Sequence, residues 1–183
     1  MSNLNEVTLS VLNKEEYDSN PEFYQKGIDK ILKSNKSSGK EEINLEEILN
    51  NNPLNSIVIL SVNNIILGYM ISIAYFNYLD QECEIDRWNI TSLYVHKKYR
   101  KTDYGKMLLY YAINELRLKG VIKLNYDTTK TYSYLINQLL AKHKIYAVGL
   151  TSDSVSFSQL ENIDTINMEE EYEKLIAELG TKK

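Results

Sequence analysis

The feature that most constrains this fold is one continuous unit: a strand, a basic loop, an amphipathic helix and a second strand. The first strand is RWNITSLYV (87–95), and the second is VIKLNYD (121–127). Between them, residues 103–119 place apolar side chains at the i, i+3, i+4, i+7 spacing of one helical face, and Gly120 marks the helix end. A crossover helix is the connection that parallel strands need. The sequence therefore predicts 88–95 and 121–127 as adjacent parallel strands in a mixed α/β sheet.

The rest of the chain alternates between strand-like and helix-like segments. Before this unit, we expect a strand over 6–12, a helix over 14–34, a polar loop over 34–42, a helical turn over 43–49, a hairpin over 55–76 and an acidic loop over 79–86. After it come a helix over 132–144, a strand pair over 146–160 and an amphipathic helix over 166–179. Asn63 and Asn64 join the hairpin, because Asn tolerates the positive φ of a tight turn. We expect one domain over 1–162 and a helical C-terminal appendage over 163–183.

Composition narrows the class of protein. A length of 183 residues favours one domain, and a formal net charge of −4 argues against a nucleic-acid binder dominated by phosphate contacts. Cys83 is the only cysteine, so no intrachain disulfide can form and no metal site is expected. The polar start and the lack of an apolar run of about 20 residues favour a cytoplasmic protein without a membrane segment.

The loop between strand and helix is strongly basic. Its cationic residues are Lys97, Lys98, Arg100, Lys101 and Lys106. A helix N-terminus leaves N–H groups unpaired and carries partial positive charge, so a basic loop before it can hold a phosphate. The alternative is a solvated surface turn, since charge runs are usually exposed.

The order and spacing of the strand, loop and helix segments resemble those of the GNAT superfamily of N-acyltransferases. The resemblance covers about residues 56–150 and is carried by ILGYMISI, then NITSLYV, then Arg100 followed five residues later by Gly105 and an apolar helix. It implies a GNAT-like, V-shaped mixed central sheet flanked by helices, in which the two parallel strands splay apart at their ends. It also implies acetyl-CoA as co-substrate and direct transfer of the acetyl group to an amine.

The resemblance implies which residues would hold coenzyme A. The pantetheine arm would pair with the strand residues Leu93, Tyr94 and Val95. The pyrophosphate would meet Arg100 and the backbone N–H groups of Lys101, Thr102, Asp103, Tyr104, Gly105 and Lys106. The acceptor would be a small-molecule or protein amine. Residues 33–42 and 77–86 would select it, and the acidic second loop suits a cationic amine.

Three positions depart from the family pattern. Asp103 replaces the first Gly of the loop, where a carboxylate would repel pyrophosphate, although we favour an N-cap role for it. Leu140 stands where many members carry a Tyr as acid, and Tyr132 and Tyr134 nearby are interpreted as packing residues. Thr91 and Ser92 stand where members often carry the base. The candidate acids that remain are Glu84, Asp86 and Asp127, while His96 and His143 are interpreted as an exposed and a structural histidine.

These departures keep a second hypothesis open. The chain could retain the GNAT fold without catalysis and serve as an interaction or structural protein. Its richness in Asn, Lys, Ile and Tyr, whose codons are AT-rich, would fit a phage or bacterial gene. Under either hypothesis, the C-terminal helix is a candidate contact for a homodimer or a protein partner.

Overall fold

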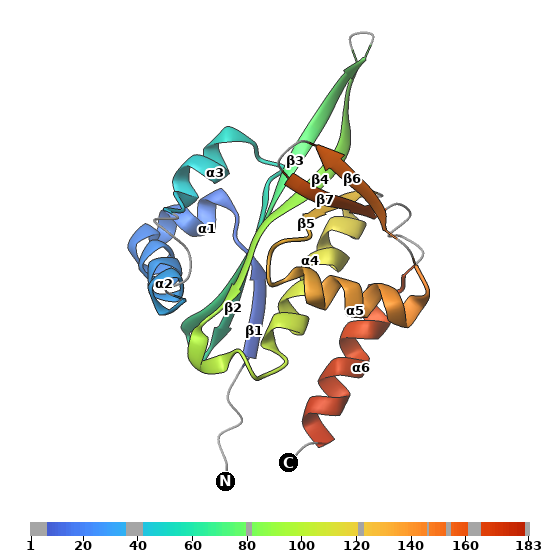
Figure 1. Cartoon of the computed structure of the whole chain (residues 1–183). Helices are drawn as coiled ribbons and strands as arrows, with labels where there is room; N and C mark the ends of the chain where they lie inside the picture. The colour runs from blue at the N-terminus through green and yellow to red at the C-terminus, as the bar shows by residue number, and fades with distance from the viewer. Residues whose placement is uncertain are drawn as a thin grey trace.

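A computed structural model describes residues 7–35, 42–79, 82–120, 123–145, 147–152, 155–160 and 166–181. It contains one seven-stranded sheet in the order β1-β2-β3-β4-β5-β7-β6 (Figure 1). The strands are β1 (Val7–Val11), β2 (Ser56–Val62), β3 (Ile65–Leu79), β4 (Glu82–Val95), β5 (Leu124–Asp127), β6 (Val148–Ser152) and β7 (Val155–Leu160). All neighbouring strands pair antiparallel except β4 and β5, so the sheet is mixed as predicted.

Helices cover both faces of the sheet. They are α1 (Lys14–Ser19), α2 (Pro21–Ser34), α3 (Leu45–Asn51), α4 (Tyr104–Leu118), α5 (Ser133–His143) and α6 (Met168–Thr181), with a 3-10 turn η1 (Lys97–Tyr99) before α4. Figure 1 shows α1–α3 on one face and α4–α6 on the other. Two apolar cores result, one under each layer of helices.

The predicted parallel pair is confirmed. Trp88, Asn89 and Ile90 of β4 pair in register with Leu124, Asn125 and Tyr126 of β5. No pairing between the two strands extends beyond Ile90 and Tyr126, and β5 ends one residue later. The two strands therefore separate at this point, and β4 continues toward the basic loop paired only with β3 on its other side.

Backbone geometry confirms both predicted turns. Asn63 and Asn64 have φ angles of 50° and 61°, as a two-residue hairpin with positive φ at both central positions requires. Gly120 has a φ of 81° just after α4, a conformation that glycine adopts without a Cβ clash.

Two predicted segments are corrected. The helix expected over 14–34 is broken at Asn20, which ends α1 and whose side chain caps α2, because a residue before proline avoids helical φ/ψ. The acidic loop expected over 79–86 is mostly strand. The pairs Tyr78–Cys83 and Leu79–Glu82 extend the β3–β4 hairpin into this segment, and residues 77–86 contain no glycine or proline.

The C-terminal helix α6 packs along α4. Met168 and Leu175 are buried in the core beneath it, and the ring of Tyr172 meets that of Tyr111 on α4 at 6.2 Å between centroids. Ile176, which the helical spacing also predicts on this apolar face together with Leu179, is 40% exposed, while the side chain of Leu179 lies outside the described residues. The boundary between residues 162 and 163 stays a prediction. Within the described ranges, no helix is both long and apolar enough to cross a bilayer.

Candidate active site

A cavity of about 410 Å³ opens where β4 and β5 separate. Its lining residues come from β4, the basic loop, the start of α4 and the segment leading into α5: Leu93, Tyr94, Val95, Arg100, Lys101, Thr102, Asp103, Gly105, Lys106, Thr131, Tyr132, Tyr134, Leu135 and Gln138. Nearly every residue predicted to bind the cofactor therefore borders one space. Tyr104 is the exception, because it lines a different cavity beside His96 and Tyr99.

One wall of the cavity is the free edge of β4. Because β5 pairs only as far as Ile90, residues 91–95 have no partner strand on this side among the described residues. An open strand edge can take an extended ligand as an added strand. At the start of this edge, the Ile90 carbonyl accepts a hydrogen bond at 2.8 Å from the hydroxyl of Tyr132, a buried residue that precedes α5.

The opposite wall is the loop and the first turn of α4. The N–H groups of Arg100 and Thr102 donate to carbonyls of the preceding turn, and that of Tyr104 donates to the Thr102 hydroxyl at 3.4 Å. Gly105 and Lys106, at the second and third helical positions, have no partner within the helix. These are the N–H groups that a helix start offers to an anion.

Two glycines bring the walls close together. A Cβ on Gly105 would lie 3.1 Å from Leu135 Cδ1 and 4.0 Å from Val95 Cγ2, so α4 starts tightly between β4 and α5. A Cβ on Gly68, in the LGY stretch of β3, would lie 2.6 Å from Leu108 Cδ1. The glycines therefore set how closely α4 approaches the sheet.

Arg100 is positioned by a residue that the sequence did not single out. Its guanidinium donates to Oδ1 of Asn35, which follows α2 and is 4% exposed. Asn35 in turn donates through Nδ2 to the carbonyls of Ile31 at 2.9 Å and Val95 at 3.4 Å. The end of α2 thus fixes the arginine, the strand end and the loop relative to one another.

Asp103 does not cap α4 as expected. It occupies the N-cap position, but its side chain makes no capping hydrogen bond. Its carboxylate instead lies 3.5 Å from Lys106 Nζ and lines the cavity. The backbone at Asp103, with a φ of −78° and a ψ of 9°, departs from the extended conformation typical of a capping residue.

Of the candidate acids, the structure describes only the side chain of Asp127. Asp127 lies outside this cavity, and its Oδ1 accepts hydrogen bonds from the Thr129 N–H at 2.8 Å and the Thr129 hydroxyl at 2.6 Å. The side chains of Glu84 and Asp86 lie outside the described residues. Leu140 is buried in the apolar core, whereas the phenols that border the cavity are those of Tyr94, Tyr132 and Tyr134.

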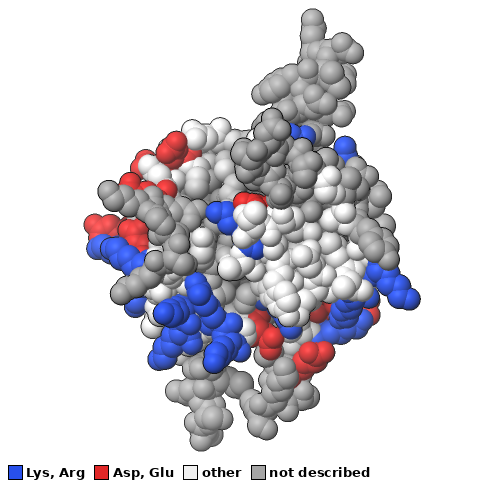
Figure 2. Space-filling view, in the orientation of Figure 1, with Lys and Arg blue, Asp and Glu red and all other residues white. Residues whose placement is uncertain are grey.

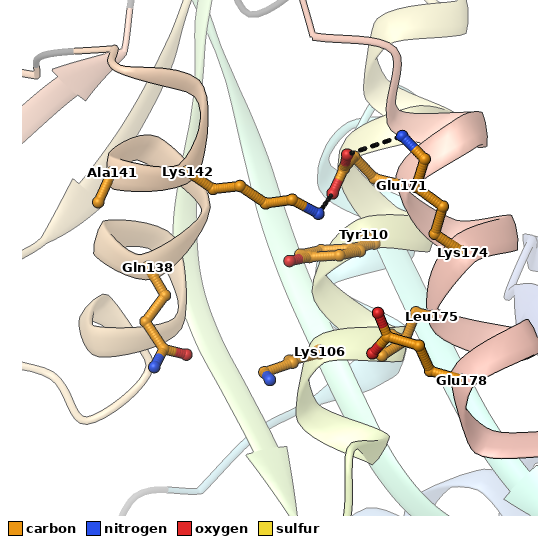
Figure 3. Close-up of a pocket in the computed structure, with 9 residues that line it drawn as sticks. All are labelled: Lys106, Tyr110, Gln138, Ala141, Lys142, Glu171, Lys174, Leu175 and Glu178. Carbon is orange, nitrogen blue, oxygen red and sulfur yellow. Dashed lines mark hydrogen bonds and ion pairs between the residues drawn. The ribbon is translucent and has the colours of Figure 1, made fainter. Parts of the chain in front are cut away.

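A second cavity of about 440 Å³ lies between α4, α5 and α6 and shares Lys106 and Gln138 with the first (Figure 3). Lys142 and Lys174 both reach toward Glu171, whose side chain is only 4% exposed. Burial raises the pKa of Glu171, but the hydrogen bond and charge of Lys142, with His143 and Lys174, outweigh it and hold that pKa below its usual range. This ionised carboxylate ties α6 to α5.

Basic side chains gather at the mouth of the first cavity. Figure 2 shows a cluster of Lys and Arg at the lower left of this face, where Figure 1 draws the turn between β4 and α4. That turn contains Lys97, Lys98, Arg100 and Lys101. Positive charge, a helix start and an open strand edge thus meet at one site, a combination suited to an extended ligand with phosphate groups.

The family profile described as "Acetyltransferase (GNAT) family" matches residues 19–135, more than half of the chain. The chain belongs to the GNAT acetyltransferase family. The resemblance inferred from the loop and its flanking strands is confirmed, and the match extends upstream of it into α1 and α2. No curated protein sequence matches significantly.

Solved GNAT structures share the fold at low sequence identity. A GNAT-family protein from Desulfovibrio desulfuricans is 13% identical with a TM-score of 0.59, over 85% of this chain and 99% of that one. The ribosomal-protein-S18-alanine N-acetyltransferase of Escherichia coli is 14% identical with a TM-score of 0.56, over 86% and 94%. A mutant of the toxin AtaT, bound to the C-terminus of the antitoxin AtaR and to acetyl-CoA, is 13% identical with a TM-score of 0.52, over 88% and 97%.

Proposed function

We propose that this GNAT protein is an N-acetyltransferase that transfers the acetyl group of acetyl-CoA directly to an amine. The observation that carries the proposal is the cavity at the β4–β5 splay, which brings together the open strand edge, Arg100 and the glycine-containing start of α4. A GNAT neighbour binds acetyl-CoA, which supports the choice of donor.

In this proposal, the donor lies along the cavity. Its pantetheine arm pairs with the backbone of Leu93–Val95, and its pyrophosphate meets the N–H groups of Gly105 and Lys106. Arg100, held by Asn35, supplies the positive charge on one side. The amine attacks the thioester carbonyl, a backbone N–H of β4 stabilises the oxyanion, and the C–S bond then breaks. We assign protonation of the departing thiolate to Tyr132, because this residue borders the cavity and its hydroxyl lies on the Ile90 carbonyl, where β4 and β5 separate.

Calorimetric titration of the full chain with acetyl-CoA and with CoA tests whether the protein binds the proposed donor. We expect binding by the wild type, and Arg100→Ala should weaken it by about 1.5–3 kcal/mol, the size of a hydrogen bond to a charged group. Lys98→Ala is the matched control, because Lys98 belongs to the same basic turn but does not border the cavity. No heat with millimolar CoA would reject the proposal.

The non-catalytic alternative gains from the burial of Leu140 and from the carboxylate of Asp103 in the cavity. It predicts no CoA binding and no thiol release with any amine. A protein partner or second copy on α6 stays a prediction, which is supported by the antitoxin-bound state of the AtaT neighbour. The cytoplasmic location and the phage origin also stay predictions.

A further inference from the structure

The basic loop between β4 and α4 has a second side, which the proposed function leaves unused. His96, Lys98, Tyr99 and Tyr104 do not border the donor cavity. They line a separate cavity of about 340 Å³, which lies near the lower end of the range of about 300–1,000 Å³ for small-molecule sites. The loop therefore separates two cavities, and only one of them is assigned to the donor.

This second cavity lies between the loop, the β2–β3 turn and α2, and we call it the hairpin-side cavity. Its described lining residues are Lys30, Val62, Asn63, Ile65, Ile66, Leu67, His96, Lys98, Tyr99 and Tyr104. The positive φ of Asn63 and Asn64 turns β3 back beside β2. Because Gly27 has no side chain, α2 packs closely on this hairpin: an added Cβ would lie 2.7 Å from Ile66 Cδ1. Lys30 follows one helical turn later and reaches the cavity.

The charged side chains of the hairpin-side cavity are cationic. Among its described lining residues, none carries a carboxylate. Lys30 and Lys98 form no ion pair within the part of the chain that the structure describes, and Lys98 lies over the ring of Tyr99, 5.7 Å from its centroid. Asp29, next to Lys30 on α2, accepts a hydrogen bond from Gln25 at 3.0 Å and lines a different cavity.

The lack of ion pairs here contrasts with other lysines of the chain. Lys14, Lys26, Lys106, Lys142 and Lys174 each form an ion pair with a carboxylate. Acids outnumber bases in this protein, whose formal net charge is −4, so carboxylates are not scarce. Like charges that border one space repel each other, and an anion placed between them is attracted to both. The cavity is therefore electrostatically suited to a negatively charged ligand.

Two neutral hydrogen-bond donors add to the two cations. Nδ1 of His96 accepts a hydrogen bond from the Lys98 N–H at 3.4 Å, so the neutral ring carries its proton on Nε2. Burial, together with the neighbouring Tyr99, raises the pKa of Tyr104, so its hydroxyl keeps its proton. Within the described residues, neither this hydroxyl nor Nε2 of His96 has a hydrogen-bond partner. Both groups can donate to an anion.

The rest of the lining is apolar. The side chains of Val62, Ile65, Ile66 and Leu67 form the hairpin wall. Ile65 is 54% exposed, so a ligand that covered it would remove apolar surface from water. The rings of Tyr99 and Tyr104, 6.1 Å apart between centroids, form an aromatic wall opposite. A ligand matched to this cavity carries an apolar body as well as a negative charge.

We propose that the hairpin-side cavity binds a small carboxylate with an apolar body, and that this ligand weakens the binding of acetyl-CoA on the other side of the loop. The carboxylate lies between Lys30 and Lys98, and the apolar body covers Ile65. The effect on acetyl-CoA rests on the proposed function, whereas binding of the carboxylate does not.

The coupling between the two cavities follows from the shared loop. Lys98 and Tyr99 line the hairpin-side cavity, and the next residues, Arg100 and Lys101, border the donor cavity. A negative charge on one side lowers the positive potential that the pyrophosphate meets on the other. By linkage, each ligand weakens the other by the same factor. We expect a factor of about five, the lower end of typical coupling between sites.

Calorimetric titration of the full chain at constant ionic strength, without CoA, tests the site itself. Phenylacetate supplies the charge and the apolar body, acetate supplies the charge alone, and phenylethanol supplies the body alone. We expect phenylacetate to bind about tenfold more tightly than either, because each of the others loses one of the two contacts. Equal binding of phenylacetate and phenylethanol would show that the lysines play no part and would overturn the inference.

Variants of exposed side chains locate the binding of phenylacetate. Lys30→Ala and Lys98→Ala should each weaken it about tenfold, the loss of one hydrogen bond to a charged group. Ile65→Asp places a carboxylate in the cavity and should abolish it. Lys33→Ala and Lys97→Ala are the matched controls, because these lysines belong to the same two helical segments but do not line the cavity. Equal losses in the controls would reduce the effect to general surface charge and overturn the site.

Titration with acetyl-CoA at rising phenylacetate concentrations tests the coupling. We expect the apparent Kd for acetyl-CoA to rise about fivefold and then level off, as two separate, linked sites require. Lys98→Ala should remove this effect and leave the affinity for acetyl-CoA alone unchanged. An apparent Kd that kept rising without a plateau would place phenylacetate in the donor cavity and overturn the inference.

These outcomes are distinguishable from a failure of the proposed function. A wild type that fails to bind acetyl-CoA rejects the proposed function, while binding of phenylacetate that depends on Lys30 and Lys98 would still establish the carboxylate site. A wild type that binds acetyl-CoA but does not bind phenylacetate rejects only this inference. The same holds if the affinity for acetyl-CoA stays constant at every phenylacetate concentration.

Discussion

The two faces of the sheet at β4 handle charge in opposite ways. Facing α4, the strand end leads into a cavity bordered by Arg100, Lys101 and Lys106. Facing α1–α3, the same strand presents the uncharged groups Asn89 and Ser92. A phosphate-bearing donor needs fixed positive charge, whereas a buried charge without a partner would lose its hydration. The comparison teaches that one strand can serve both environments, because alternate side chains point to opposite faces.

The largest effect that would sharpen this comparison is expected on the donor face, at Tyr132. Tyr132→Phe should lower kcat about 100-fold, the smaller end of the range for general acid catalysis, with little change in CoA affinity. Steady-state kinetics with acetyl-CoA and an amine acceptor measures it. Tyr134→Phe is the control, because Tyr134 borders the same cavity but is 64% exposed. Equal loss in both variants would refute the assignment.

Packing offers a matched pair of glycines, one for each face. Gly68→Ala places a Cβ against Leu108 and 3.1 Å from the Tyr94 carbonyl, and should cost about 1–3 kcal/mol of unfolding free energy. Gly27→Ala, on α2, meets Ile66 at 2.7 Å but regains about 0.5–1 kcal/mol of helix propensity. Denaturant unfolding should therefore show the greater loss for Gly68→Ala, and the reverse order would contradict the tighter fit beneath α4.

The buried carboxylate of α6 gives a pH-dependent effect that belongs to the α4 side alone. Glu171→Gln should lower the free energy of unfolding by about 1–2 kcal/mol at pH 7. Because the folded pKa of Glu171 is lowered, its contribution is present above the unfolded pKa of about 4.3 and disappears as the pH falls through the folded pKa. Unfolding curves of wild type and variant should converge at acidic pH. A difference that persisted there would rule out the charge as its origin.

The smallest expected effect concerns Asp103, whose carboxylate borders the donor cavity. Asp103→Gly should tighten CoA binding by about 0.5–1 kcal/mol by removing a charge and a Cβ from the loop. Because Asp103 makes no capping hydrogen bond, Asp103→Ala should cost less stability than the roughly 1 kcal/mol of a working cap. For both variants, titration with CoA measures the change in affinity and denaturant unfolding measures the change in stability. Weaker CoA binding by the Gly variant would show that Asp103 orients Lys106 rather than repelling phosphate.

The parts of the site that were predictable come from one short stretch. The predicted cofactor residues all fall within 93–106, so the strand, the loop and the helix start could be placed from local pattern. The structure gathers nearly all of them around one cavity. Asn35 and Tyr132 were not assigned to the site, because they reach it from 65 and 42 residues away. Their role depends on how α2 and the α5 segment pack, which no local pattern records. The strand at 82–86 was predicted as a loop because its residues are largely acidic, and its pairing with β3 cannot be read from local composition.

The sequence by itself determined the β–α–β unit, its parallel strands, the Asn63–Asn64 turn and the end of α4 at Gly120, since these follow from apolar spacing and backbone preferences within a few residues. Only the tertiary structure decided that Arg100 is held by Asn35, that Glu171 is buried among cations, and that Asn89 and Asn125 stand side by side in the β4–β5 register. These features depend on which distant groups share a buried space. Desolvation and pairing energies are set by that space rather than by neighbours along the chain.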